Sequence, residues 1–293
     1  MSIFRGAAVA LVTPLDNAGL VNYEALEELV EFQIASNIDT LVICGTTGEA
    51  STLTDDEQIE AIRTAVVKAN KRVPVIAGAG SNYTDHGVEL CRRSQQAGAD
   101  GVMLVTPYYN KTSQKGLVEH FARQAAAIDI PVIVYNVPSR TGLNVLPKTT
   151  LALSKIPNIA GIKEASGSIV QISEIAELCG DALDIYAGND DYIVPVMSMG
   201  GKGVISTAAN IIPKDIHDIC SAFFAGDLSA ARDMQIKILD LVRALFCDVN
   251  PIPVKTALNL MGLRVGGFRQ PLTSMDEERL EILKASMTRY GLI

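Results

Sequence analysis

Short hydrophobic segments recur along the chain at intervals of roughly 20–33 residues. Each has about five residues, is rich in β-branched side chains and has no polar face, which is typical of strands covered on both sides. We predict eight such strands: Ala7–Val12, Thr40–Cys44, Val73–Ala77, Gly101–Val105, Pro131–Tyr135, Ile159–Lys163, Leu183–Ala187 and Gly203–Ser206.

Amphipathic segments separate these strands and carry helix-start signals. Asn22 is a predicted N-cap, Thr54 and Glu57 form a predicted capping box, and Ser168 is a predicted N-cap further along. Eight buried strands alternating with helices predict an α/β protein whose parallel sheet closes into a (β/α)8 TIM barrel.

An open doubly wound sheet is the alternative architecture. Its dinucleotide-binding loop needs three glycines in a G-x-G-x-x-G pattern after a strand. Gly78-Ala79-Gly80 follows the third predicted strand, but Tyr83 stands where the third glycine belongs. Asp100, the acidic residue about 20 positions on, precedes a strand instead of ending one. The pattern therefore favours the barrel and an ordinary glycine turn.

The alternation of strands and helices stops after Gly226. Beyond it, Asp227–Phe246, Pro253–Met261 and Ser274–Tyr290 have helical patterns, with turns between them. We therefore predict a catalytic barrel over residues 1–226 and a C-terminal helical region over residues 227–293.

Composition and charge narrow the class of protein. Of the 293 residues, 48% are hydrophobic and 20% charged, so the chain has ample apolar surface to fold around. The net charge is −8, and no basic run is present, so a nucleic-acid partner is not expected. The first 14 residues lack a signal-peptide pattern, and no apolar stretch approaches the 18 residues of a membrane span, so no membrane partner is expected either.

The sequence lacks the cysteine and histidine patterns that are typical of metal sites and redox sites. The five cysteines form no C-x-x-C pair, which indicates reduced thiols and a cytoplasmic protein. The three histidines lack metal-ligand spacing, and Asp190 and Asp191 are adjacent, so they would not face each other on a helix. We predict neither a metal nor a cofactor.

In a barrel of this kind, catalytic residues lie at the carboxyl ends of the strands. Lys163 ends the sixth predicted strand, just inside the barrel mouth. Desolvation there would lower the pKa of its ammonium, and a neutral amine can form a Schiff base with a ketone. The alternative is a lysine whose stem lies along the strand while its charge reaches solvent.

Other strand ends supply groups that suit a keto acid. Tyr135 ends the strand before Lys163 and could relay protons, unless it is only a core aromatic. Gly45-Thr46-Thr47-Gly48 could hold a carboxylate, or it could be a tight turn. Arg140 suits a second carboxylate, or lies at the surface. Cys44 has no histidine near it in sequence and is interpreted as a small buried residue.

With these residues in place, the chain resembles the dihydrodipicolinate synthase and N-acetylneuraminate lyase family of pyruvate-dependent class I aldolases. The resemblance covers essentially the whole chain. Five motifs carry it: Gly45-Thr46-Thr47-Gly48-Glu49, Pro107-Tyr108-Tyr109-Asn110, Tyr135-Asn136-Val137-Pro138-Ser139-Arg140-Thr141-Gly142, Gly161-Ile162-Lys163-Glu164-Ala165 and Asn250-Pro251-Ile252-Pro253-Val254-Lys255.

The resemblance implies a condensation of pyruvate with L-aspartate 4-semialdehyde that yields 4-hydroxy-tetrahydrodipicolinate for lysine and diaminopimelate synthesis. It also implies a homo-oligomer, a tetramer built as a dimer of dimers. The implied roles are Lys163 for the Schiff base, Tyr135 for proton transfer through Thr47 to Tyr109, Thr46 and Thr47 for the pyruvate carboxylate, Arg140 for the second carboxylate, and the backbone groups of Gly188 and Ile205 for the pyruvate pocket. In the family, the residue matching Tyr109 completes the active site of a neighbouring subunit.

Two other functions are alternatives to this condensation. Sialic-acid lyases of the family have serine in place of Thr46, and Arg140 matches the synthase branch, so a lyase acting on a sugar-derived 2-keto acid is the runner-up. A non-catalytic regulator or binding module on the same barrel would need neither Lys163 nor Tyr135.

The resemblance also points to a feedback site for lysine between subunits. The matching positions are Ala50, Ser51, Asp55, Gln58, Asn82, His86 and Tyr108. Lysine-inhibited bacterial members often have a glutamate where His86 stands, and histidines where Asp55 and Gln58 stand. His86 cannot supply a negative charge to the lysine ligand, so weak or absent inhibition is expected.

Overall fold

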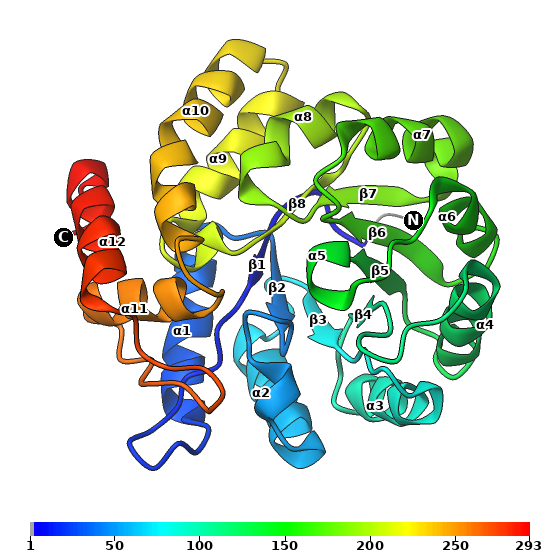
Figure 1. Cartoon of the computed structure of the whole chain (residues 1–293), viewed down its shortest axis with the longest axis horizontal. Coiled ribbons are helices and arrows are strands. Elements are labelled where there is room, and N and C mark those ends of the chain that lie inside the picture. The colour runs from blue at the N-terminus through cyan, green and yellow to red at the C-terminus, as the bar shows by residue number, and fades with distance from the viewer. Residues whose placement is uncertain (1–2) are drawn as a thin grey trace.

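The structure is a computed structural model and describes residues 3–293. Eight parallel strands form a closed barrel in chain order, and the last strand pairs with the first (Figure 1). The strands are β1 (Gly6–Ala10), β2 (Thr40–Ile43), β3 (Val75–Gly78), β4 (Gly101–Val105), β5 (Val132–Asn136), β6 (Ile159–Glu164), β7 (Asp184–Ala187) and β8 (Gly203–Ser206). The predicted (β/α)8 architecture is confirmed, and the closed sheet excludes the doubly wound alternative.

All eight predicted strands are present, and their ends differ from the prediction by two residues at most. The first strand was expected to reach Val12 but ends at Ala10. Beyond Ala10, the Val12 N–H donates to the side chain of Asn210 at 3.1 Å instead of to a strand. A contact with a residue 198 positions away in the chain, in the turn after the neighbouring strand β8, therefore accompanies the early end of the strand.

Helices surround the barrel between successive strands. They are α1 (Tyr23–Ala35), α2 (Asp55–Ala69), α3 (Thr84–Gln96), α4 (Gln114–Ala125), α6 (Pro147–Leu153), α7 (Ile169–Cys179), α8 (Ile193–Ser198) and α9 (Pro213–Phe224). The predicted N-caps are confirmed: Asn22 accepts from the Ala25 N–H, the Thr54–Glu57 capping box forms, and Ser168 accepts from the Gln171 N–H.

Short helical turns that the sequence pattern did not predict follow four of the strands. They are η1 (Ala50–Thr52), α5 (Pro138–Thr141), η3 (Asp190–Tyr192) and η4 (Ala208–Asn210), while η2 (Gly180–Ala182) precedes β7. The first four follow the carboxyl ends of β2, β5, β7 and β8, where they shape the barrel mouth.

The chain ends in α10 (Leu228–Leu245), α11 (Ile252–Leu260) and α12 (Glu277–Tyr290), which match the three predicted C-terminal helices. Figure 1 shows them together on one side of the barrel, where α10 packs against α8 and α9 and α12 packs against α10 and α11. The segment after residue 226 therefore packs against the outer helices of the barrel. The predicted division into a barrel of residues 1–226 and a C-terminal helical region stays a prediction.

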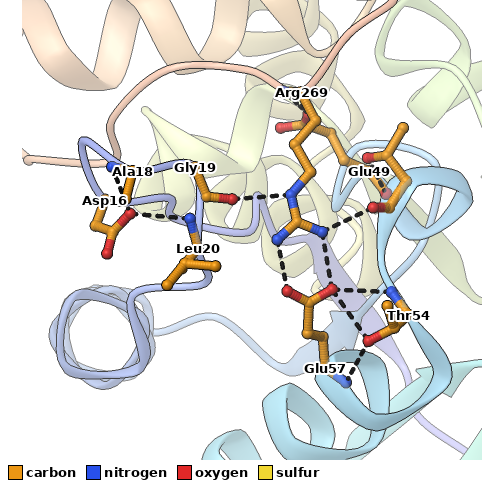
Figure 2. A network of polar contacts seen from close by, with 9 residues as sticks. Asp16, Ala18, Gly19, Leu20, Glu49, Thr54, Glu57 and Arg269 are labelled. Carbon is orange, nitrogen blue, oxygen red and sulfur yellow. Dashed lines mark hydrogen bonds and ion pairs between the residues drawn. The ribbon is translucent and has the colours of Figure 1, made fainter.

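Arg269, which follows α11, ties this C-terminal segment to the barrel (Figure 2). Its guanidinium donates to both carboxylate oxygens of Glu57, at 2.5 and 2.8 Å, and to the carbonyl oxygens of Gly19 and Thr52. These bonds lower the pKa of Glu57 to about 2. Because Glu57 also completes the capping box with Thr54, the C-terminal segment is fastened to the N-terminus of α2.

Two layers of apolar side chains make up the core. One fills the barrel interior and includes Phe4, Ile133, Tyr186 and Ile205, and the larger one lies between the strands and the outer helices. No helix within residues 3–293 is long and apolar enough to cross a membrane.

Candidate active site

A cavity of about 530 Å³ opens at the carboxyl ends of the strands. Its walls come from the loop after β2, from β5 and β6, from the turns after β5, β7 and β8, and from the connection between α10 and α11. Lining residues include Thr46, Thr47, Tyr135, Arg140, Lys163, Gly188, Asp190, Thr207, Arg243 and Asn250. Six of the eight predicted site residues meet here.

Lys163 lies on β6, in register with Tyr135 on β5. Only 5% of Lys163 is exposed, and its Nζ lies 4.3 Å from the centre of the Tyr135 ring. Burial lowers the pKa of Lys163 to about 8, the Asp190 carboxylate opposes this shift, and the Arg140 guanidinium adds to it. This burial contradicts the alternative in which the charge of Lys163 reaches solvent. Because burial lowers the pKa of Lys163, a fraction of the side chain is a neutral amine near neutral pH.

Tyr135 is buried beside this amine. Burial raises the pKa of its phenol, although Arg140 and a hydrogen bond with Thr46 act in the opposite direction. The phenol therefore keeps its proton at neutral pH and can donate it to an oxygen atom that develops negative charge nearby. The aromatic ring also forms part of the cavity wall.

The two threonines of the loop after β2 have different partners from those expected. Thr46, not Thr47, makes the hydrogen bond with the Tyr135 phenol. The Thr47 hydroxyl accepts from Nδ2 of Asn250 at 2.9 Å and lies 3.5 Å from the Thr207 hydroxyl. The predicted link from Tyr135 through Thr47 stays a prediction, and Thr46 is the second candidate for it.

Asn250 joins two parts of the cavity that are far apart in sequence. Its side chain donates to Thr47, and its carbonyl oxygen accepts from Nη2 of Arg140 at 3.0 Å. Arg140 is exposed but borders the cavity, so this bond helps to fix a flexible cation at the mouth. Asn250 had no predicted role, although it starts one of the family motifs.

Gly188 and Ile205 were both expected to line the pocket. Gly188 does so, and a Cβ atom there would lie 2.6 Å from Cβ of Ala165 and 2.9 Å from the Glu164 carbonyl oxygen. Ile205 instead lies fully buried in the barrel core and is not among the residues that border the cavity in the described part of the chain. The expectation concerned the backbone groups of Ile205 and stays a prediction, and its side chain points into the barrel interior.

Tyr109 lies outside the cavity of its own chain. It is 93% exposed and follows β4 in a loop where its φ is +69°. A large aromatic side chain held in the left-handed backbone region and exposed to solvent has no packing role within one subunit. Its predicted contact with a neighbouring subunit stays a prediction.

The positions expected to hold lysine lie in η1, α2, α3 and the loops after β3 and β4: Ala50, Ser51, Asp55, Gln58, Asn82, His86 and Tyr108. His86 Nε2 lies 2.9 Å from Oδ1 of Asp55, and its Nδ1 lies 3.0 Å from the Ser81 hydroxyl. Gln58 is buried and donates to the Gly78 carbonyl oxygen, so its side chain turns inward. The Asp55 carboxylate is therefore engaged by His86.

A buried lysine beside a buried phenol, at the strand ends of a (β/α)8 barrel, is typical of enzymes that bind carbonyl substrates through a Schiff base. Residues 3–289 match the Dihydrodipicolinate synthetase family. The chain is 55% identical to the 4-hydroxy-tetrahydrodipicolinate synthase of Thermoanaerobacter sp. (strain X514) over 294 residues, covering 100% of this chain and 99% of that relative. This chain belongs to the dihydrodipicolinate synthetase family.

Solved structures agree with this assignment. The dihydrodipicolinate synthase of Aquifex aeolicus has a TM-score of 0.96 and 42% identity, with 99% of each chain covered. The chloride-inhibited synthase of Acinetobacter baumannii, complexed with pyruvate, has the same TM-score, identity and coverage. The similarity spans the barrel and the C-terminal helices alike.

Proposed function

We propose that the chain condenses pyruvate with L-aspartate 4-semialdehyde to form 4-hydroxy-tetrahydrodipicolinate, with Lys163 as the Schiff-base lysine. The activity is that of a 4-hydroxy-tetrahydrodipicolinate synthase in lysine biosynthesis, as in the relatives that match over the full length. The observation that carries the residue assignment is the burial of Lys163 against Tyr135, with a pKa lowered to about 8.

The reaction uses the neutral amine of Lys163 as nucleophile. Its Nζ attacks the keto carbon of pyruvate, the carbinolamine loses water to form an iminium ion, and loss of a methyl proton gives an enamine. The enamine carbon attacks the aldehyde carbon of the second substrate. The amino group of that substrate then attacks the former keto carbon, which closes the ring and releases Lys163.

The surrounding groups bind and transfer protons. The Tyr135 phenol donates a proton to the departing carbinolamine hydroxyl, with Thr46 hydrogen-bonded to it. The Thr47 hydroxyl oxygen accepts a hydrogen bond from Asn250, so the Thr47 O–H can donate to the pyruvate carboxylate. Arg140, steadied by the Asn250 carbonyl oxygen, holds the carboxylate of the second substrate.

An assay of purified protein with both substrates tests the proposed function. Turnover of pyruvate with L-aspartate 4-semialdehyde supports it. Pyruvate release from a sugar-derived 2-keto acid, without turnover of the semialdehyde, would instead favour the lyase alternative. The full-length relatives are synthases and favour the first result.

We further propose a homo-oligomer, a tetramer made of two dimers, in which Tyr109 reaches the partner's cavity. Tyr109→Phe is expected to lower kcat about 10- to 100-fold, because the phenol would extend the proton path from Thr46. Tyr290→Phe on α12 is the matched control, since it removes a phenol far from the cavity. Sedimentation velocity and initial rates provide the readouts. A fully active Tyr109→Phe protein, or a fully active monomer, would contradict this proposal.

Feedback by L-lysine is expected to be weak or absent. The only carboxylate near His86 among the described positions of this site, Asp55, is already bonded to it. Burying a lysine ammonium without a full partner costs on the order of 1–3 kcal/mol, about tenfold to a hundredfold in affinity. Initial rates at saturating pyruvate across a lysine titration measure the effect. Half-inhibition in the sub-millimolar range would show the expectation to be wrong, and His86→Glu is expected to strengthen inhibition.

A cytoplasmic location is also part of the proposal. Four of the five cysteines, Cys44, Cys91, Cys179 and Cys220, are buried free thiols, and the fifth, Cys247, is partly exposed and also free. Free thiols persist in a reducing compartment.

A further inference from the structure

The mechanism above leaves one buried carboxylate at the cavity without a role. Asp190, at the start of η3, is 2% exposed and borders the cavity. Its Oδ2 accepts the backbone N–H groups of Thr207 and Ala208 at 3.1 and 3.0 Å, and its Oδ1 accepts the Ser206 hydroxyl. Burial raises the pKa of Asp190, whereas these three donors, all from the end of β8 and the turn after it, and the nearby Lys163 ammonium lower it and favour the carboxylate.

The charged and titratable groups around Lys163 come from five elements. Arg140 on α5 and Asp190 on η3 act on its charge, and Tyr135 on β5 lies under its Nζ. Tyr186 on β7 donates its hydroxyl to the Phe4 carbonyl oxygen at the other end of the barrel. Glu164, the next residue on β6, is engaged elsewhere by Asn136, Gln171 and the Ser166 N–H. Lys163 and Asp190 border the same cavity, and Asp190 is the carboxylate there whose charge raises the pKa of Lys163.

We propose that Asp190 is a positioning residue that provides a fixed counterion for the charged nitrogen of Lys163, first as an ammonium and then as the iminium ion of the pyruvate adduct. This inference rests on the proposed function. A carboxylate already held in place by three donors stabilises a developing cation without reorganising. The iminium ion, not the neutral imine, readily loses the methyl proton, so a counterion that keeps this nitrogen protonated keeps the adduct in its reactive form.

Asp190→Asn tests this proposal because it removes the charge and keeps the shape. The amide oxygen can accept the Thr207 and Ala208 N–H groups, and the amide nitrogen can donate to the Ser206 hydroxyl. In the parent protein, the rate of imine formation with pyruvate is expected to rise with pH. The inflexion of this pH–rate profile should lie near the Lys163 pKa of about 8. In Asp190→Asn, the inflexion is expected to fall by on the order of 1 pH unit, because an attracting charge is lost. The loss of the counterion should also lower kcat about tenfold at unchanged thermal stability.

Two variants separate charge from structure. Asp191→Asn removes the adjacent exposed carboxylate, which does not act on Lys163, and should leave the inflexion in place. Ser206→Ala removes one donor but keeps the Asp190 charge, so the inflexion should not fall. If Asp190 only held the turn after β8, both Asp190→Asn and Ser206→Ala would change KM and stability without a downward shift.

An unmoved inflexion in folded Asp190→Asn would overturn the proposal. Should that variant not fold, Asp190→Ser takes its place, and a lowered inflexion in it supports the proposal whereas an unmoved inflexion overturns it. In the same experiment, borohydride trapping of the pyruvate adduct on Lys163 is measured in the parent protein. Absence of that adduct would refute the proposed function itself, whereas its presence with an unmoved inflexion refutes only the role of Asp190.

Discussion

Lys163→Met is expected to lower kcat/KM for pyruvate by on the order of 10⁴-fold or more, because it removes the nucleophile of the covalent step. The same variant should be at least as stable as the parent protein. The pKa of Lys163 is lower in the folded chain than its ordinary value of 10.5, so at pH 7 the buried ammonium costs stability that methionine would restore.

Coupled initial rates and thermal unfolding measure the two parts of this prediction. Lys284→Met is the matched control, since Lys284 is an exposed residue of α12 that pairs with Glu281. The control should keep parental activity. A Lys163→Met protein within tenfold of the parental kcat/KM would contradict the assignment of the nucleophile.

Lys255→Met is expected to lower the free energy of unfolding by about 3–5 kcal/mol. The side chain of Lys255 is fully buried, and its Nζ lies 2.6 Å from Oε1 of Glu49, whose side chain is 3% exposed. Removing the ammonium leaves a buried carboxylate whose remaining bond is a 3.4 Å contact with the Arg269 N–H. Urea unfolding at pH 7 measures the loss.

Two comparisons make this second prediction specific. Lys284→Met again serves as control, because loss of an exposed ion pair should change stability by less than about 1 kcal/mol. The double variant Glu49→Gln/Lys255→Met should recover much of the loss, since no unpaired charge remains. A loss below about 1 kcal/mol in Lys255→Met alone would show that the pair does not hold the C-terminal segment to the loop after β2.

The fold was predictable because strands buried on both faces carry a signal that does not depend on their partners. Segments such as Gly101–Val105 and Gly203–Ser206 were located to the residue. The pairing of Tyr135 with Lys163 was also accessible, because successive strands of a parallel barrel place their carboxyl ends side by side.

Other features of the site depend on contacts that no local pattern carries. Which of Thr46 and Thr47 faces Tyr135 depends on the direction of side chains in an irregular loop. Asn250 meets Thr47 across 203 positions of chain, and Asp190 receives its hydrogen bonds from the turn after β8. The role of the exposed Tyr109 depends on how the chain assembles with other subunits, and no local sequence pattern carries that information.

The most direct measurement is reductive trapping of the Schiff base. The protein is incubated with pyruvate and borohydride, digested, and mapped by mass spectrometry, with a sample lacking pyruvate as control. We predict a single reduced pyruvate adduct on Lys163, with Lys255, the other lysine that is buried within residues 3–293, left unmodified because it is paired with Glu49. An adduct on another lysine, or none, would contradict the central claim that Lys163 is the Schiff-base residue.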